Sequence, residues 1–169
     1  MEENRLIGNS KSAIDILGRE WKFDCIGCSI ANHEITTPGG LIYEDDIFTI
    51  QQDPEVPING FVIINVKKHI NSITALNDNE RIKLVELMNR VITYLKELGV
   101  TEQVTIVQEE RSKHLHIWIF PYHSWMDEKY GKGVSYLRDI CEYAQNNNNQ
   151  NLISEILTTV KELQIKFNS

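Results

Sequence analysis

The chain has 169 residues, a formal net charge of −7 at pH 7 and 41% hydrophobic residues. This length and apolar content predict one domain with a sizeable core. The acidic balance argues against a general nucleic-acid surface, and the longest apolar runs are too short to span a bilayer. The first ten residues, MEENRLIGNS, do not follow the pattern of a secretory signal. With an odd count of three cysteines, this start predicts a reducing, cytoplasmic environment.

The N-terminal half predicts a short helix followed by three strands. A helix is expected from about Ser12 to Glu20, within an N-terminal extension over residues 1–21, and a turn-rich stretch, CIGCSIANHEITTPGG, follows it. LIYED and IFTIQQD then predict two short strands that meet at an acidic turn. The β-branched run GFVIINV, residues 60–66, predicts a buried strand.

The clearest helix is expected from about Asp78 to Leu98. Asn77 is a suitable N-cap residue, and Glu80 completes a capping box. Gly99 follows as a C-terminal stop. Apolar residues recur with the helical period and predict one buried stripe, consisting of Leu84, Val85, Met88, Val91, Ile92, Leu95 and Leu98.

Two more strands and two helices complete the predicted order. QVTIVQ and SKHLHIWIF predict strands, and Pro121 stops the second. GVSYLRDICEYAQ and LISEILTTVKELQI predict C-terminal helices over residues 123–169, packed on the same domain. The order and the short connections predict an α+β fold, in which an antiparallel sheet of about five strands packs with one long helix, plus extra C-terminal helices.

The stretch SKHLHIWIF alternates strictly. Leu115, Ile117 and Ile119 share one face of the strand, and the opposite face carries His114, His116, Trp118 and Phe120. A neutral imidazole attacks phosphorus well if its other nitrogen donates a proton to a fixed acceptor. Taken alone, the H-x-H pattern favours the alternative that both histidines are simply hydrogen-bonded structural residues.

Cys25 and Cys28 are two residues apart in a predicted turn, a spacing that lets two thiolates reach one metal. The alternatives are a thioredoxin-like redox pair or two free thiols. A redox pair calls for a helix directly after the turn, and SIANHEITTPGG is a poor long helix. The pattern therefore favours a metal.

Four blocks together, CIGCSIANHEI, LIYEDDIFTIQQD, GFVIINVKKHI and HLHIWIFP, resemble the histidine-triad superfamily of nucleotidyl hydrolases and transferases. They occur in the family's order and near its spacing. The resemblance covers roughly residues 22–122 and predicts a histidine-triad-like domain there.

The family motif is His-φ-His-φ-His-φ-φ, with φ apolar and the middle histidine as the nucleophile. The resemblance implies His114 as the first histidine and His116 as the residue that takes the nucleotidyl group. Trp118 stands at the third position and departs from the pattern. Phe61 likewise stands where many members have histidine. We expect the two aromatic residues to form one apolar wall of the substrate pocket.

The resemblance also implies residues that hold the substrate. Asp53 corresponds to the acidic residue that binds the ribose hydroxyls, although before Pro54 it also suits a turn. Gln108 falls where an amide contacts phosphate. The loop of residues 109–113 is shorter than in many members, and its own residues Ser112 and Lys113 are further candidate donors to the substrate.

In zinc-containing members, a C-x-x-C pair, the histidine of a K-x-H block and the first triad histidine bind the metal. The resemblance therefore implies a structural zinc ion held by Cys25, Cys28, His69 and His114, with no open coordination position. It also implies a homodimer, because histidine-triad proteins are often two-fold dimers.

The sequence thus predicts a hydrolase or transferase that acts on a small-molecule nucleotide conjugate, a dinucleoside polyphosphate or a nucleoside phosphoramidate, through a covalent nucleotidyl-histidine on His116. The alternative is a nucleotide-binding module or sensor in which Trp118 and Phe61 have removed turnover. A zinc-stabilised redox protein is the third hypothesis.

Overall fold

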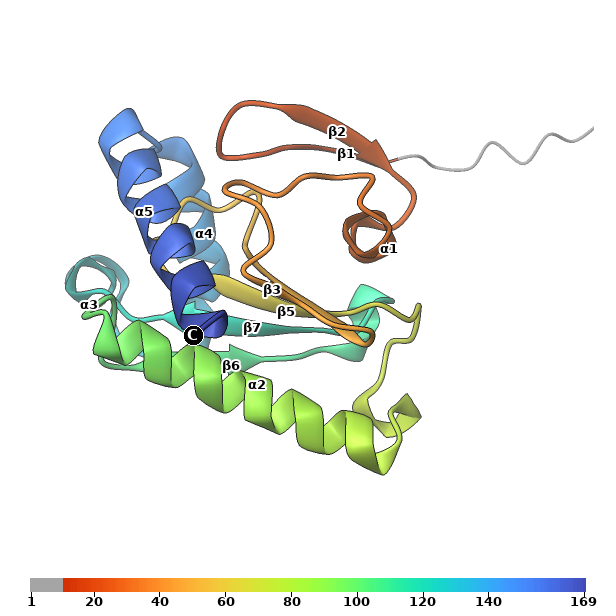
Figure 1. Cartoon of the computed structure of the whole chain (residues 1–169). Coiled ribbons are helices and arrows are strands. Elements are labelled where there is room, and N and C mark those ends of the chain that lie inside the picture. Colours follow the sequence, from red (N-terminus) through yellow and green to blue (C-terminus); the bar gives the residue numbers. More distant parts are fainter. Residues whose placement is uncertain (1–10) are drawn as a thin grey trace, which may run out of the picture.

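The computed structural model describes residues 11–169 and shows a five-stranded sheet with helices on both faces (Figure 1). Its five strands are β3 (Tyr43–Glu44), β4 (Phe48–Gln52), β5 (Val62–Val66), β6 (Val104–Val107) and β7 (His116–Pro121). A separate hairpin is formed by β1 (Lys11–Ile14) and β2 (Glu20–Phe23). The helices are α1 (Ile26–Ala31), α2 (Asp78–Glu97), α3 (Ser124–Tyr130), α4 (Leu137–Asn146) and α5 (Gln150–Phe167), with 3-10 turns η1 (Ile73–Ala75), η2 (Glu110–Ser112) and η3 (Val134–Tyr136).

The strand order in the large sheet is β3-β4-β5-β7-β6, and every neighbouring pair is antiparallel. The predicted fold class is confirmed. β7 is a central strand, between β5 and β6, so its two faces contact different layers of the molecule. The alternation predicted for SKHLHIWIF therefore sends its apolar set and its histidine set to opposite sides.

One face of the sheet builds the main core with α2 and α5. Leu115, Ile117 and Ile119 pack there with the buried side of α2, as the alternation predicts. The predicted α2 stripe is nearly correct. Val85 is 63% exposed, and Leu87 is buried instead. The buried stripe runs from Leu84 through Leu87 to Leu95 in steps of three and four residues, and Val85 lies outside it.

The ends of α2 are as predicted. The side chain of Asn77 accepts from the Glu80 amide at 2.9 Å, and the Glu80 carboxylate accepts from the Asn77 amide at 2.9 Å. Gly99 follows the helix with φ +69°, a conformation that favours glycine. This capping fixes where α2 begins and ends.

The helix expected from Ser12 to Glu20 is wrong, since β1 and β2 pair antiparallel across this segment. Asp15 explains the difference. Its carboxylate accepts hydrogen bonds from the Leu17 amide at 2.9 Å and the Arg19 amide at 3.0 Å, a local turn that competes with a helix. Trp21 Nε1 donates to the same carboxylate at 3.0 Å. Residues 1–10 of the predicted extension lie outside the described residues.

The two predicted C-terminal helices are present as α4 and α5. The structure adds two short helices that were not predicted, α3 and α1, the latter inside the turn-rich stretch. The asparagine-rich segment before α5 makes two hydrogen bonds that position this helix. Asn149 caps α5 by accepting from the Leu152 amide at 3.0 Å, and Asn148 donates to the Ile16 carbonyl at 3.0 Å. No helix among residues 11–169 is long and apolar enough to cross a membrane.

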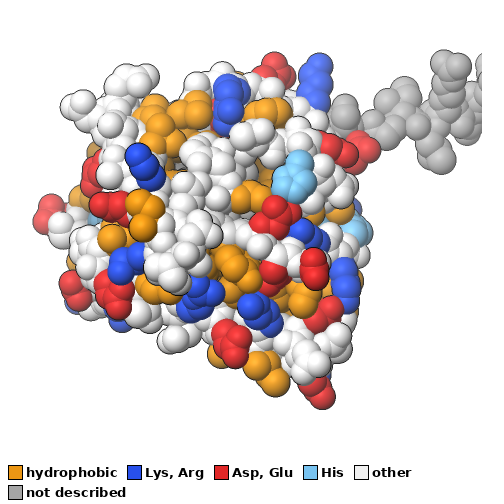
Figure 2. Space-filling view, in the orientation of Figure 1, with side chains coloured by type: hydrophobic (Ala, Val, Ile, Leu, Met, Phe, Trp, Pro, Cys, Tyr) orange, Lys and Arg blue, Asp and Glu red, His pale blue; other side chains and the backbone are white. Residues whose placement is uncertain are grey.

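Acidic and basic side chains are interspersed on the face of the molecule seen in Figure 2. No broad basic stripe of the kind that follows a nucleic-acid backbone runs across this view.

Candidate functional site

The second face of the sheet, opposite α2, carries the predicted site. The antiparallel register places side chains in rows across three strands: Thr49–Asn65–His116 is one row and Gln51–Ile63–Trp118 is the next. The short helix α1 and the β1–β2 hairpin lie over this face (Figure 1). His116 and Trp118 belong to β7, and His114 comes just before it. All three side chains therefore face α1 and not the main core.

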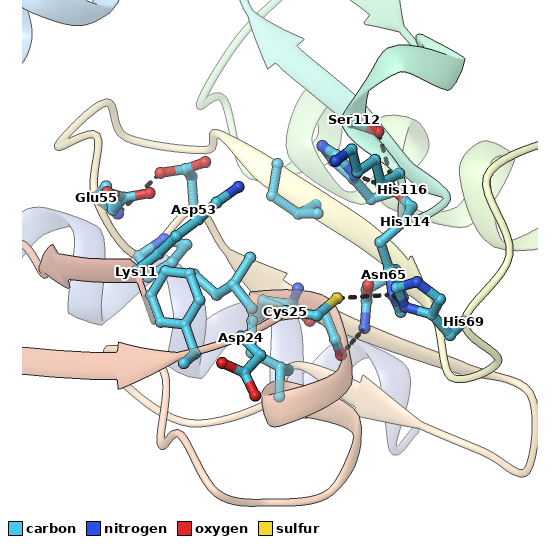
Figure 3. A pocket seen from close by; sticks show the side chains of 18 of the residues that line it. Lys11, Asp24, Cys25, Asp53, Glu55, Asn65, His69, Ser112, His114 and His116 are labelled. Atoms are coloured by element: carbon cyan, nitrogen blue, oxygen red, sulfur yellow. Dashed lines mark hydrogen bonds between the residues drawn. The ribbon is translucent and has the colours of Figure 1, made fainter. Parts of the chain in front are cut away.

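A cavity of about 490 Å³ lies between the sheet face and these covering elements. In Figure 3, Asp53 and Glu55 lie at one end with Lys11 beside them, while Ser112, His114 and His116 lie at the other end. Its lining includes the predicted site residues Cys25, Asp53, His69, Ser112, His114, His116 and Trp118. The fold thus brings most of the predicted residues to one cavity.

The His116 ring is held by the backbone. Its Nδ1 lies 2.8 Å from the carbonyl oxygen of His114. Since a carbonyl only accepts, Nδ1 carries the proton and Nε2 keeps a free lone pair. Ser112 Oγ donates to the same carbonyl oxygen at 3.1 Å, so the hydroxyl group lies beside the backbone group that holds the His116 ring. This is the tautomer that an imidazole nucleophile requires.

His114 is turned the other way. Its Nε2 donates to the carbonyl oxygen of Val66 at 2.7 Å, which leaves Nδ1 as an acceptor. That Nδ1 lies 3.3 Å from Cys25 Sγ, 3.6 Å from Cys28 Sγ and 3.4 Å from His69 Nδ1. Cys28 Sγ also lies 3.2 Å from His69 Nδ1. Burial lowers the pKa of His114, which favours its neutral, ligating form.

The four ligand atoms fit a tetrahedral zinc ion. All lie within 4.8 Å of one another. Bonds of ordinary zinc length predict edges of about 3.4 Å between two nitrogens and about 3.6 Å between nitrogen and sulfur. The nitrogen–nitrogen distance of 3.4 Å and one nitrogen–sulfur distance of 3.6 Å match these values, and the other two nitrogen–sulfur distances, 3.3 and 3.2 Å, are slightly shorter. Burial, with Cys25 next to it, raises the pKa of the Cys28 thiol to about 11, so a bound cation is what would stabilise its thiolate.

Gly27, between the two cysteines, lets α1 approach His114 closely. A Cβ atom at Gly27 would lie 2.4 Å from His114 Cδ2. The Gly27 carbonyl accepts from Asn65 Nδ2 at 3.1 Å. The first turn of α1 is therefore held against β5 and against the His114 ring, which joins the cysteine turn to the strand that carries His116.

Asp53 forms the expected turn and also lines the cavity. Its Oδ1 accepts from the Glu55 amide at 2.9 Å and from the Val56 amide at 2.8 Å, which is the turn expected before Pro54. The side chain also lines the cavity. Burial raises the pKa of Asp53 to about 7, against the two backbone donors that lower it. Its charge therefore changes near neutral pH.

Trp118 and Phe61 are packed together, but only Trp118 lines the cavity. Their ring centroids are 5.1 Å apart at 76°, an edge-to-face contact. Phe61 has no exposed surface and belongs to a second core cluster with Phe120 and Met126. The expected aromatic wall is present, with Phe61 as the layer behind it and not as a surface of the pocket.

Gln108 does not line the cavity that the described residues form. Gln108 directly follows Val107, the last residue of β6, which pairs with Trp118. The Gln108 amide instead donates to the Asn71 carbonyl at 3.5 Å. The Gln108 side chain is thus directed to the loop at Asn71, and its contact with phosphate stays a prediction.

Several lining residues were missed by the sequence analysis. Lys11 and Phe23 come from the β1–β2 hairpin, in a segment where a helix was expected instead. Lys113, an expected donor, also lines the cavity and follows η2 with φ +65°. Gln51 and Asn65 come from strands predicted as core. For the two amides a signal existed, because polar residues interrupt otherwise apolar strands.

No protein-family model matches the chain, and no curated protein matches it. Solved structures do match. A zinc-bound histidine triad family protein from Mycobacterium smegmatis superposes with a TM-score of 0.56 at 14% identity, over 83% of this chain and 96% of that one. The chain has the histidine-triad fold.

Two further matches agree on the fold. A HIT family protein from Bacillus subtilis gives a TM-score of 0.54 at 17% identity, covering 74% of this chain and 92% of that one. A hypothetical histidine triad nucleotide-binding protein from Sulfolobus tokodaii gives 0.52 at 21% identity, covering 83% and 94%. A match over 83% of the chain takes in more than residues 22–122, so the histidine-triad likeness extends beyond the four sequence blocks.

Proposed function

We propose that this chain is a nucleotidyl hydrolase or transferase that forms a covalent nucleotidyl-histidine on His116. The observation that carries the proposal is the 2.8 Å contact between His116 Nδ1 and the His114 carbonyl, inside a cavity of about 490 Å³. With the proton on Nδ1, Nε2 is left unprotonated, with a free lone pair that can act as the nucleophile. The candidate substrates are dinucleoside polyphosphates and nucleoside phosphoramidates.

The step is a displacement at the α-phosphorus. The Nε2 lone pair forms a nitrogen–phosphorus bond while the bond from phosphorus to the leaving oxygen or nitrogen breaks. The imidazole becomes cationic, and the carbonyl oxygen that accepts from Nδ1–H stabilises that charge. Water or another acceptor then attacks the phosphorus, the nitrogen–phosphorus bond breaks and His116 is restored.

The substrate spans the cavity from end to end. Asp53 accepts from the ribose hydroxyls at the acidic end, where its ionised form is the better acceptor. Ser112 and Lys113 supply a hydroxyl donor and a positive charge at the phosphate end. Glu109, which would repel phosphate, pairs with Arg111 at 2.9 Å. Trp118 forms the wall beside the phosphates.

Zinc at Cys25, Cys28, His69 and His114 would be structural, because four protein ligands leave no open position. The distances between the ligand atoms support this set. The ion would supply a fixed clamp between α1 and the residue whose carbonyl holds His116. The oligomeric state stays a prediction, and a homodimer is what the fold suggests.

A second candidate function is a nucleotide-binding module without turnover. The packing of Trp118 on Phe61 favours it, since the pair places apolar rings where a third imidazole would relay a proton. Tryptophan donates one hydrogen bond and neither accepts nor carries charge.

Mass spectrometry after mixing with adenosine 5′-phosphoramidate tests the proposal. A mass increase of one nucleotidyl unit on the peptide that carries His116, lost in His116→Ala, supports the enzyme. His33→Ala is the matched control, because that side chain is 63% exposed and does not line the cavity. Micromolar nucleotide binding without modification or turnover would support the module instead.

A further inference from the structure

Gln51 is a buried polar side chain on the cavity wall that the function above does not use. It is 1% exposed and lines the cavity. Its Oε1 is buried and has no hydrogen-bond partner among residues 11–169. The next residue differs: Gln52 is equally buried, and its amide donates to the Ile58 carbonyl at 3.0 Å.

An unpaired buried acceptor is costly. Leaving one without a partner destabilises a protein by roughly 1–3 kcal/mol, and such groups in native structures usually have a further role. Leucine or methionine would fill this strand position without that cost. The terminal amide torsion of glutamine is broad, so a ligand in the cavity can draw the oxygen toward itself.

The surroundings of Gln51 indicate what the ligand presents there. Gln51 is in one row with Ile63 and Trp118, and Phe23, Ile26 and Ile30 line the same cavity from β2 and α1. Asp53, two residues along the chain, is the proposed ribose ligand. A flat group with apolar faces and a polar edge, attached to the ribose, fits this place. A nucleobase has that form.

We propose that Gln51 reads the polar edge of the nucleobase, and that this edge presents a donor next to an acceptor, as the N6 amino group and ring nitrogen of adenine do. A carboxamide matches that edge with two hydrogen bonds. Gln51 is thereby a specificity-determining residue. The inference rests on the proposed function, because it takes the ligand to be a nucleotide.

Binding of AMP and of purine riboside 5′-monophosphate, which lacks only the amino group, tests the inference by titration calorimetry. The wild type is expected to bind AMP about 3- to 10-fold more tightly, the effect of one neutral hydrogen bond. In Gln51→Met the two nucleotides should bind equally. The variant should be at least as stable as the wild type, since it replaces an unpaired acceptor with an apolar group.

The outcomes separate this inference from the proposed function. If His116 is modified but the AMP preference is the same in wild type and Gln51→Met, Gln51 does not read the base and the enzyme stands. If neither nucleotide binds and His116 is never modified, both fail. A Gln51→Met protein that unfolds at a clearly lower temperature also refutes the inference, because Gln51 is then a structural residue. Gln51→Leu repeats the test with a different shape.

Discussion

Replacing Gly27 by alanine places a methyl group against the ring of His114. The added Cβ would lie 2.4, 2.6 and 2.7 Å from three ring atoms, whereas carbon atoms in contact are normally about 3.5–4.0 Å apart. The ring or α1 must therefore move by about 1 Å. The ring cannot yield easily, because His114 is 4% exposed and its Nε2 is bonded to the Val66 carbonyl at 2.7 Å.

The size of the effect follows from what such a shift breaks. Overpacking costs about 1–3 kcal/mol, and loss of the hydrogen bond to Val66 adds about 0.5–1.5 kcal/mol. We expect Gly27→Ala to lower the free energy of unfolding by roughly 2–4 kcal/mol, which is a fall of about 4–16 °C in melting temperature for a chain of this size. A metal site tolerates only about 0.2 Å of ligand displacement, so zinc content should fall as well.

Thermal denaturation and metal analysis of four proteins measure this. They are the wild type, Gly27→Ala, His114→Ala and the double variant. If the methyl group acts on the ring, Gly27→Ala should cost far less in the His114→Ala background than alone, which is the non-additivity of residues in contact. Equal melting temperatures and zinc contents for Gly27→Ala and wild type would refute the argument, as would strictly additive losses.

Three other predictions concern the site. The double exchange Phe61→His with Trp118→His should raise hydrolysis of adenosine 5′-phosphoramidate about 10- to 100-fold, because it restores a proton-relaying group; a measurable wild-type rate that stays unchanged in a folded variant contradicts this. The Asp53 pKa is raised from 3.8 to about 7 on folding, so the folded state binds the extra proton and the contribution of Asp53 to wild-type stability should decrease as pH rises from 4 to 7. Asp53→Asn should therefore gain roughly 2 kcal/mol relative to wild type between pH 5 and pH 8 in urea unfolding, and the exposed control Asp24→Asn should show no such gain. Protein purified without a histidine tag should contain about one zinc per chain, falling below half in Cys28→Ser but not in Cys141→Ala; substoichiometric zinc in the wild type with two titratable thiols would count against the site.

Periodicity and capping were enough to predict the main elements. The boundaries of α2 follow from Asn77, Glu80 and Gly99, which act within one turn of the chain. The strand alternation likewise sent Ile117 to the core and His116 to the other face. The hairpin at residues 11–23 was not predicted, because the contacts that decide it are the hydrogen bonds of one carboxylate, Asp15.

The candidate site was predicted in part. The clustering of Cys25, Cys28, His69 and His114 was expected from the resemblance and is present in the fold. The placement of Gln108 was not, because this residue lies just past the end of β6, where strand alternation no longer decides the direction of a side chain. Phe61 was expected to face the substrate, and only packing shows that Trp118 stands in front of it.

Residue types and their spacing by themselves determined the fold class, the long helix, the two faces of the strand at His116 and a cysteine pair able to bind a metal, because these depend on periods of 2 and 3.6 and on side-chain chemistry. Only the tertiary structure decided which nitrogen of each histidine is free, which polar side chains are left unpaired and which residues enclose the cavity. Those properties depend on distances between segments far apart in the chain: the Val66 carbonyl fixes His114, and the fold of β4 against β5 and α1 leaves Gln51 buried at the cavity without a partner.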